Sequence, residues 1–200
     1  MPKSKGEKSR DLIVEKATIL LARKGFDQTS FQEIADECGV SQATPIYHFR
    51  SKEGLFRAVV ESIRKNKQRL LQQNVEMKDD AFDRLLKYFR GHLNWAEVYR
   101  YEAGVFLQLH HFASFDSGFA AIYQEIAIFE RREIESLIVA GQREKIFLPK
   151  QPTSLLAEIL HDCILGVVTN LLAGRGQLHS PRLLERKSKL MIQKILDYEI

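Results

Sequence analysis

Between residues 41 and 48 the chain carries several side chains that can exchange hydrogen bonds, with no carboxylate among them. The polar members of this run are Ser41, Gln42, Thr44, Tyr47 and His48, and Ala43 among them presents only a methyl group. Amide, hydroxyl and imidazole groups pair with the edges of nucleic-acid bases, and a run without carboxylates does not repel phosphate. These residues are therefore candidates for contacting double-stranded DNA.

The residues around this run predict two short helices. Ser30 and Glu33 have the spacing of a capping box that opens the first helix. Gly39 ends that helix and supplies a turn, and Ser41 is expected to cap the second helix, which runs to Phe49. Two such helices form a helix-turn-helix pattern, and the second, about 12 Å long, fits the major groove of B-DNA. Short helix pairs also occur in purely structural bundles, so the pattern alone leaves that alternative open.

Three further residues are candidates for binding the phosphate backbone. Thr29 and Ser30 lie at the expected start of the first short helix, where free N–H groups and the helix dipole favour an anion. Lys52 falls in the first turn of the next helix, an unfavourable place for a cation unless an anion lies nearby. A DNA phosphate at Lys52 would resolve this conflict, and an ordinary solvated lysine is the alternative.

The distribution of charge is consistent with contact to a polyanion. The net formal charge is +4, and residues 1–70 carry 14 Lys and Arg against 9 Asp and Glu, while the remainder carries 16 against 17. An N-terminal basic arm is expected to be disordered and to follow the DNA backbone or enter the minor groove. It contains Lys3, Lys5, Lys8 and Arg10. A solubilising basic tail would explain the same excess.

The periodicity of the apolar residues predicts an all-α protein of about nine helices. The first three form an N-terminal helix-turn-helix domain over residues 1–50. Residues 51–200 are expected to form a helical bundle that senses a ligand and dimerises, entered through a linking helix over 51–74. The expected helices are 9–24, 30–39, 41–49, 51–74, 80–99, 101–113, 116–144, 153–173 and 181–198. Connectors are expected at 77–80, 147–152 and 174–176.

The expected helix at 80–99 has two apolar faces. One is an ordinary core stripe, whereas the other mixes aromatic rings with polar tips. This second face carries Tyr88, His92, Trp95 and Tyr99. A helix that packs on the core with one face and presents aromatic rings with polar tips on the other is typical of the wall of a small-molecule pocket. The aromatic rings favour a largely hydrophobic effector. The other walls are expected from Phe106, His110, Tyr123 and Phe129. An aromatic stripe at helical spacing is equally typical of plain core.

Other kinds of chemistry find little support in the sequence. His110 and His111 diverge by about 100° on a helix and cannot easily share an ion, so we expect no metal and no cofactor. No phosphate-binding loop, nucleophile elbow or zinc motif occurs, so we expect no enzyme. Cys38 and Cys163 are expected to be buried free thiols, which favours a cytoplasmic protein. The N-terminus lacks the pattern of a signal peptide, and no run of about 18 apolar residues predicts a membrane span.

The last two expected helices, 153–173 and 181–198, carry more apolar residues than one buried face uses. Pairing both helices with their symmetry copies would make a four-helix interface, so we expect a homodimer. Gly166 would allow close approach at the crossing. A monomer that buries both helices internally is the alternative.

Three segments carry a resemblance to a known family. They are Thr29-Ser30-Phe31-Gln32-Glu33-Ile34-Ala35, Cys38-Gly39-Val40-Ser41 and Tyr47-His48-Phe49-Arg50-Ser51-Lys52-Glu53-Gly54-Leu55-Phe56. From about Leu12 to Phe56 the sequence resembles the N-terminal domain of the tetracycline-repressor (TetR) family. The resemblance implies an N-terminal unit that binds operator DNA and a C-terminal region that dimerises and holds a ligand.

The second short helix departs from the family pattern, which has an aliphatic residue and then tyrosine where this chain has Pro45 and Ile46. Proline is tolerated in a first helical turn, and its ring can fill an apolar slot. Ile46 cannot give phosphate the hydrogen bond of a tyrosine, and Tyr47 is the candidate replacement. We expect a repressor that a small effector releases from operator DNA. The alternatives are an activator, a ligand-independent regulator, or a helical carrier or enzyme with a vestigial DNA-binding head.

Overall fold

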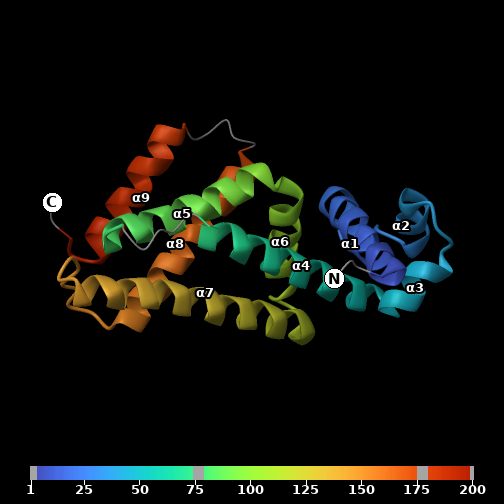
Figure 1. The fold of residues 1–200 in the computed structure, drawn as a ribbon, viewed down its shortest axis with the longest axis horizontal. Coiled ribbons are helices and arrows are strands. Elements are labelled where there is room, and N and C mark those ends of the chain that lie inside the picture. Colours follow the sequence, from blue (N-terminus) through green and yellow to red (C-terminus); the bar gives the residue numbers. More distant parts are fainter. Residues whose placement is uncertain (1–3, 74–78, 175–179, 199–200) are drawn as a thin grey trace. The chain divides into compact units, whose positions relative to one another are not determined.

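The chain is all-helical in the computed structural model (Figure 1), as the sequence predicts. The structure describes residues 4–73, 79–174 and 180–198, and these residues contain nine helices and no strand. In chain order the helices are α1 (Lys5–Lys24), α2 (Phe31–Cys38), α3 (Ala43–Phe49), α4 (Lys52–Gln73), α5 (Ala81–Val98), α6 (Arg100–Phe112), α7 (Ser117–Arg143), α8 (Thr153–Ala173) and α9 (Pro181–Ile195). The expected end of the linking helix at 74 and the connector residues 77–78 and 175–176 lie outside the described residues.

Packing divides the chain into two compact units. Unit 1 consists of residues 4–66 and 101–122, and unit 2 consists of residues 67–100 and 123–198 where these are described. Because α4 and α7 each contribute residues to both units, neither unit is one continuous segment. The functional boundary that the sequence suggests at residue 50 is a separate matter and stays a prediction.

In unit 1 the first three helices pack against one another (Figure 1). Ile13, Ala17 and Leu21 recur at four-residue spacing on α1 and are at most 2% exposed. Ile34 and Ala35 of α2 are equally buried. The small Ala35 side chain leaves room for close packing between the helices.

α1 begins four residues earlier than the sequence analysis expects. The Ser4 hydroxyl accepts a hydrogen bond from the Glu7 amide at 3.2 Å, and the Glu7 carboxylate accepts one from the Ser4 amide at 2.7 Å. This capping box satisfies two donors at the start of the helix. The prediction of a disordered arm is therefore wrong for three residues, Lys5, Lys8 and Arg10. Lys3 lies outside the described residues.

Four phenylalanine rings pack around the turn that follows α1. They are Phe26 of the turn, Phe56 of α4, Phe112 of α6 and Phe119 of α7. The centroid of the Phe26 ring lies 5.3, 5.6 and 5.7 Å from the other three, with edge-on contacts. Such pairs add about 0.5–1.5 kcal/mol each beyond the burial of their area. α6 also meets the end of α1, where Gln108 donates a hydrogen bond to the Leu21 carbonyl oxygen at 2.8 Å.

The corner between α3 and α4 leaves no room for a side chain at Gly54. A Cβ atom there would lie 2.3 Å from the carbonyl oxygen of Phe49. Arg50, between the two helices, has a φ of 63°, in the left-handed region. The Ser51 hydroxyl accepts a hydrogen bond from the Gly54 amide at 3.0 Å and so caps the start of α4. These contacts fix the direction in which α4 leaves α3.

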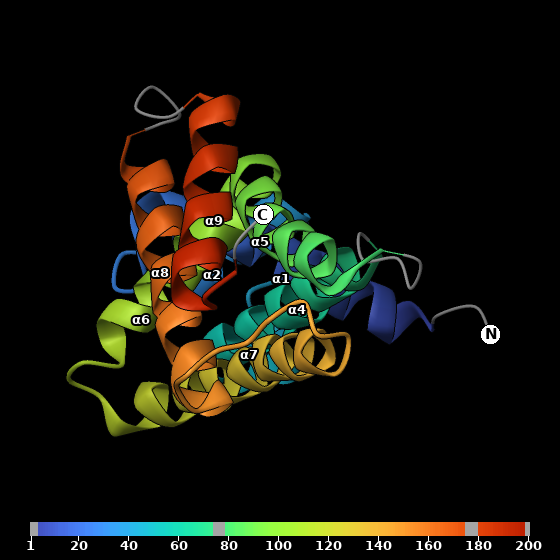
Figure 2. The same cartoon turned by 90° about the vertical axis from the view of Figure 1, so that its left-hand side faces the viewer.

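In unit 2, α5 packs against both α8 and α9, and α8 packs against α9 (Figure 2). Leu85 and Leu86 of α5 are buried, as expected of its core stripe. Tyr88, His92 and Trp95, on the second face, are buried as well. Both predicted faces of this helix are therefore buried, and the pocket expected at the second face stays a prediction.

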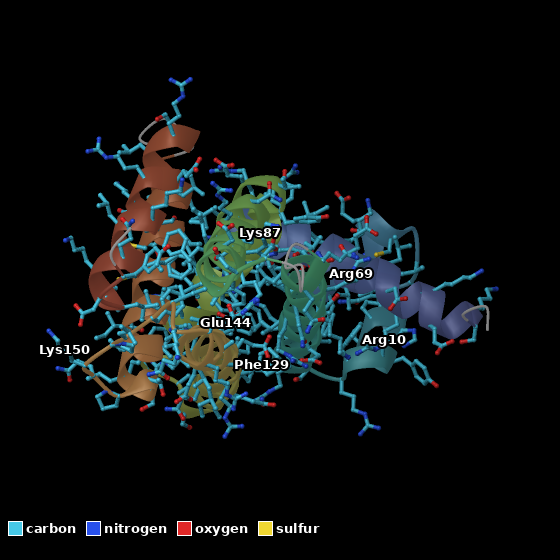
Figure 3. The ribbon with its side chains drawn as sticks, turned by 60° about the vertical axis from the view of Figure 1, so that its left-hand side comes forward. Arg10, Arg69, Lys87, Phe129, Glu144 and Lys150 are labelled. Carbon is cyan, nitrogen blue, oxygen red and sulfur yellow. The ribbon has the colours of Figure 1, made fainter. Side chains whose placement is uncertain are left out.

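The end of α7 packs closely on the start of α5. The Glu144 carboxylate accepts hydrogen bonds from the Ala81 amide, at 3.0 Å, and from the Arg84 guanidinium (Figure 3). Gly141 of α7 lies against the ring of Phe147, which has no exposed surface. A Cβ atom at position 141 would lie 2.1 Å from Cδ2 of Phe147, so only glycine allows this approach.

Gly141→Ala should lower the free energy of unfolding by about 1–3 kcal/mol, because the added methyl group overpacks a closed part of the core. Gly104→Ala on α6 is the matched control. The nearest atom to its added Cβ is 3.7 Å away, so the control should be neutral or stabilising. Urea unfolding followed by circular dichroism measures both variants. Equal stability of Gly141→Ala and the wild type would contradict the close packing.

Candidate nucleic-acid interface and buried polar centre

α2 and the turn after it have the geometry that the sequence predicts. The Ser30 hydroxyl accepts a hydrogen bond from the Glu33 amide at 3.2 Å, and the Glu33 carboxylate accepts one from the Ser30 amide at 3.1 Å. The predicted capping box is therefore confirmed. Gly39 ends α2 with a φ of 66° and a ψ of 34°, in the left-handed region. α2, this turn and α3 form the expected helix-turn-helix.

α3 buries one side and exposes the other. Pro45 and Phe49 are buried, so the proline ring fills an apolar slot as expected. Tyr47 is 82% exposed, whereas Ile46 is 42% exposed. Tyr47 is thus the more accessible of the two, which favours its hydroxyl as the group that meets a phosphate. Ile46 belongs to the same exposed side, and the sequence analysis did not count it as a contact.

The other predicted contact residues of α3 lie at its start and along its edge. Gln42 and Ala43 are exposed, and Thr44 and His48 are half-buried. Ser41 is exposed but does not cap the helix, because α3 begins at Ala43 and its N-cap residue makes no side-chain hydrogen bond. The Ser41 hydroxyl instead lies 3.2 Å from the Thr44 hydroxyl. The predicted cap is therefore wrong, and the two hydroxyls form a small polar pair.

Thr29 and Ser30 differ in what they present to solvent. Thr29 is 2% exposed, and its hydroxyl donates a hydrogen bond to the Gly25 carbonyl oxygen at 2.8 Å. In this conformation that hydroxyl is used inside unit 1. Ser30 is exposed at the N-terminus of α2. Hydrogen bonds from Lys24 and the Ser30 amide hold the pKa of the neighbouring Glu33 below its usual value.

Lys52 has two partners within unit 1. Its Nζ donates a hydrogen bond to the Asp27 carbonyl oxygen at 2.9 Å and lies 4.7 Å from the centre of the Phe26 ring. These contacts account for a cation in the first turn of α4 without DNA. Contact between Lys52 and a phosphate stays a prediction.

Arg10 adds a cation beside α3 that the sequence analysis placed in a disordered arm. Its guanidinium lies 5.3 Å from the centre of the Phe49 ring. The spacing of Ser4 and Glu7 is the sequence signal for its helical position, because it matches a capping box.

The predicted effector residues divide between the two units. Tyr88, His92 and Trp95 of α5 are buried in unit 2, and the rings of Tyr88 and His92 lie 4.8 Å apart. The half-buried members of this unit are Tyr99 at the end of α5 and Tyr123 and Phe129 of α7 (Figure 3). Unit 1 contains the other two, the buried Phe106 and the exposed His110.

Charged side chains meet the second face of α5. Lys67 of α4 and Glu130 of α7 form an ion pair with 2.8 Å between Nζ and Oε1, and their side chains are 5% and 10% exposed. The same Nζ lies 4.8 Å from the centre of the Trp95 ring. Nε2 of His161 on α8 lies 3.6 Å from the other carboxylate oxygen of Glu130. These four residues and His92 are named the polar centre below.

The surroundings of the polar centre fix two protonation states. Burial opposes the charged form of Glu130, but Lys67 and His161 outweigh burial and hold the pKa of Glu130 well below its usual range. Burial, followed by the positive charge of Lys67, lowers the pKa of His92 to about 3. At pH 7 the centre therefore contains a carboxylate at Glu130 and a neutral ring at His92. Nε2 of His92 is buried and has no hydrogen-bond partner among the residues that the structure describes.

Lys67, Glu130 and His161 were not predicted from the sequence. Lys67 and Glu130 each lie four positions from a buried apolar residue on either side, in the middle of a buried stripe. These flanking residues are Ile63 and Leu71 for Lys67, and Ile126 and Ile134 for Glu130. A charged residue at an apolar position of such a stripe is the signal that would have identified the centre.

α8 and α9 leave apolar side chains uncovered in the single chain. Leu155 and Ile159 of α8 and Leu183 and Leu190 of α9 are each between 38% and 46% exposed. Nothing lies within 4 Å of the position that a Cβ atom of Gly166 would take. Uncovered apolar surface on two adjoining helices is typical of an interface.

α8 is also long and apolar enough, by length and composition, to cross a membrane, and it is the one such helix in the described part of the chain. Only 39% of its most apolar stretch is buried. A helix of a soluble protein that packs on a partner passes the same test, so this finding alone is weak evidence for a membrane span.

Comparisons with known proteins agree with this geometry. Residues 13–59 match the family model for bacterial regulatory proteins of the tetR family. The chain is 42% identical over 52 residues to YerO, an uncharacterized HTH-type transcriptional regulator of Bacillus subtilis. It is 32% identical over 53 residues to IcaR, a negative transcriptional regulator of the biofilm operon icaADBC in Staphylococcus epidermidis. Each match covers 26% of this chain, but only 18% and 29% of the two relatives.

A solved structure matches nearly the whole fold. It is a candidate transcriptional regulator from Saccharomonospora viridis in complex with choline, 25% identical to this chain with a TM-score of 0.83. The match covers 94% of this chain and 96% of that one. An N-terminal helix-turn-helix followed by a helical bundle defines a class of transcriptional regulators. Within that class, residues 13–59 match the DNA-binding domain of the tetR family, and the resemblance drawn from the sequence between Leu12 and Phe56 is confirmed.

On acidification, the free energy of unfolding should fall less in His92→Phe than in the wild type. The folded pKa of His92, about 3, lies below the unfolded value of 6.5. Between these values the unfolded chain binds the extra proton, so the free energy of unfolding falls as the pH falls. From pH 7 to pH 5 this one group costs about 2 kcal/mol, and the variant should lose that much less than the wild type.

Urea unfolding at pH 7, 6 and 5 measures this difference. Glu130 does not interfere, because a depressed carboxyl pKa stabilises the fold throughout this interval and that stability is lost only in stronger acid. His111→Gln, at an exposed histidine, is the control and should follow the wild type. An unchanged acid dependence in His92→Phe would contradict a buried neutral ring.

Proposed function

We propose that this protein is a DNA-binding transcriptional regulator, and that it represses genes by occupying operator DNA until a small effector releases it. The observation that carries the proposal is the exposed side of α3 within a helix-turn-helix whose sequence matches the tetR family. Repression is the simplest output, because a protein bound at a promoter excludes polymerase. The matched relative IcaR is named a negative regulator, which supports this choice.

In this proposal residues 1–50 bind DNA, and residues 51–200 sense the effector and dimerise. Bases are read from α3 and its start, and phosphates are bound at Ser30, Tyr47 and Lys52. The α3 contacts are Ser41, Gln42, Ala43, Thr44 and His48. Thr29 contributes by holding the turn before α2, since its hydroxyl bonds to the Gly25 carbonyl oxygen.

Recovery and sequencing of genomic DNA fragments that the full-length protein retains at physiological salt tests DNA binding directly. Enrichment of a short, two-fold symmetric sequence upstream of genes is the expected result, because a dimer with two heads reads two half-sites. Fragments without any common sequence would overturn the proposal of a specific regulator.

Two substitutions should separate base reading from phosphate contact. Gln42→Ala should change which operator base is preferred, with a loss of about 1–3 kcal/mol at that position. Lys52→Met should weaken binding to every sequence alike and lower the salt slope by about one unit, because a phosphate contact carries no base information. Fluorescence anisotropy on matched and mismatched duplexes, at several salt concentrations, measures both effects.

Lys150→Met is the control for charge, since Lys150 is exposed in unit 2 (Figure 3). It should leave the salt slope unchanged. A wild-type slope in Lys52→Met would remove Lys52 from the interface, and an unaltered base preference in Gln42→Ala would remove Gln42.

Release by a ligand requires a molecule that binds the DNA-incompetent state more tightly than the DNA-bound state. We propose that the effector binds in unit 2 beside the polar centre. Tyr88, Tyr123 and Phe129 belong to the same unit and are the further proposed contacts. The choline complex of the Saccharomonospora viridis protein supports a small-molecule site in this fold. α4 provides a route to DNA, because the helix that carries Lys67 begins at the corner that follows α3.

We further propose that α8 and α9 pair with their copies in a second chain. Burial of their uncovered leucine and isoleucine side chains would supply the driving force at about 25 cal/mol per Å² of apolar surface, and Gly166 leaves space for a close crossing. This pairing also explains why α8 is so apolar without a membrane. A regulator of this kind acts on chromosomal DNA in the cytoplasm and needs no catalytic activity.

Ile159→Glu and Leu190→Glu should each convert a dimer to a monomer, because an unpaired carboxylate in an apolar interface costs several kcal/mol. Both side chains are partly exposed in the single chain, so each variant should keep its helical content. Leu148→Glu, at a leucine that is 70% exposed and outside both helices, is the matched control and should remain a dimer. Sedimentation measures the mass against the 23.1 kDa of one chain. A wild-type protein that stays monomeric at micromolar concentration would contradict the interface.

A further inference from the structure

The polar centre contains a carboxylate and an aromatic ring arranged around one cation. The Glu130 carboxylate lies 2.8 Å from a positively charged nitrogen, and the Trp95 ring lies 4.8 Å from the same atom. A carboxylate and an aromatic face are the groups that recognise ammonium ligands. In this chain the nitrogen belongs to Lys67, so the protein fills the site from within.

Charge balance then disfavours a charged ligand at this place. Lys67 and Glu130 neutralise each other, and both are buried. A second cation would have to displace a tethered ammonium group from Glu130. An anion would approach a carboxylate that is already paired. Burial of an ion without its own partner is costly, so either ligand would bind at a penalty.

One polar atom of the centre remains without a partner. Nε2 of His92 is buried on a residue that is 1% exposed, and it makes no hydrogen bond to the described residues. Buried polar atoms are almost always paired, so such an atom indicates a missing partner. Because its pKa is about 3, the ring is neutral and needs a hydrogen-bonding group rather than a counter-ion.

We infer that the effector of this regulator is an uncharged, largely apolar molecule whose one hydrogen-bonding group pairs with Nε2 of His92, and that Lys67 excludes organic cations by occupying the site formed by Glu130 and Trp95. The inference rests on the proposed function, in which unit 2 receives an effector. It makes Lys67 a specificity-determining residue. Removal of its charge should therefore open the centre to a free cation.

Three probes of similar shape and different charge test this inference. They are choline, its uncharged isostere 3,3-dimethylbutan-1-ol, and the anion 3,3-dimethylbutanoate. Calorimetry and the emission of Trp95, the only tryptophan of the sequence, report binding to the full-length protein. The wild type should bind the alcohol with a Kd at least tenfold lower than that of either charged probe.

Lys67→Met should reverse this preference and bind choline at least tenfold more tightly than the alcohol, because Glu130 is left without its cation. Lys67→Gln is the second variant, since its amide can still donate a hydrogen bond to Glu130 and so preserve the fold. It should also bind choline more tightly than the wild type does. The double variant Lys67→Met with Glu130→Gln carries neither charge and should bind choline no more tightly than the wild type. His92→Phe in the wild-type background should raise the Kd of the alcohol at least tenfold.

Preference of the wild type for a charged probe, or binding of none of the three, would overturn the inference. The inference would also be overturned if folded Lys67 variants bound choline no more tightly than the wild type, or if His92→Phe bound the alcohol as tightly as the wild type. DNA retention by the same preparations distinguishes the two levels of the argument. A wild-type protein that binds no DNA would contradict the proposed function. A wild-type protein that binds DNA but prefers a charged probe would contradict only this inference.

Discussion

Lys67 and Glu130 lie 2.8 Å apart where little water reaches, and neither charge is tolerable there without the other. Removal of one partner from such a pair costs about 3–5 kcal/mol, because a buried charge is left uncompensated. The pair joins α4 to α7, and Trp95 and His161 extend it to α5 and α8. Burial keeps the neighbouring His92 ring neutral, and the charge of Lys67 lowers the pKa of that ring further, whereas Glu130 opposes this shift. The character of the centre of unit 2 therefore depends on this one interaction.

α4 carries one partner of the ion pair and also contributes residues to unit 1. The helix packs in unit 1 through Leu55 and Phe56, near its start, and contributes Lys67 to unit 2 near its end. A buried ion pair is a poor means of adding stability, because apolar residues of the same shape often serve as well. The pair does tie the end of α4 to α7. A discrete contact that holds or releases this helix would give an effector something to act on.

The parts of the fold that were predictable depend on local chemistry. Ser30 and Glu33 are three residues apart, and their reciprocal hydrogen bonds require nothing else, so the capping box and the helix-turn-helix followed from the sequence. Ser4 and Glu7 carry the same signal, and reading them as part of a tail placed the start of α1 four residues late. The polar centre was not predictable in this way. Lys67 and Glu130 are 63 positions apart, and two isolated charged residues on helices are normally solvated.

The exchange of DNA-binding domains between regulators is limited by the packing of unit 1, because α6 and α7 contribute to it. A cut at residue 50 would separate Phe49 from Gly54, although the carbonyl oxygen of Phe49 fills the space that a side chain at 54 would need. It would also leave behind Gln108, which bonds to the end of α1, and the rings of α6 and α7 that pack on Phe26. A transferred domain that ends at residue 50 would therefore lack the side chains that pack on the turn after α1. A working chimera should carry the whole of unit 1, which requires three junctions: one within α4, one between α5 and α6, and one within α7. Within α4 and α7 continuous helix can be spliced turn for turn.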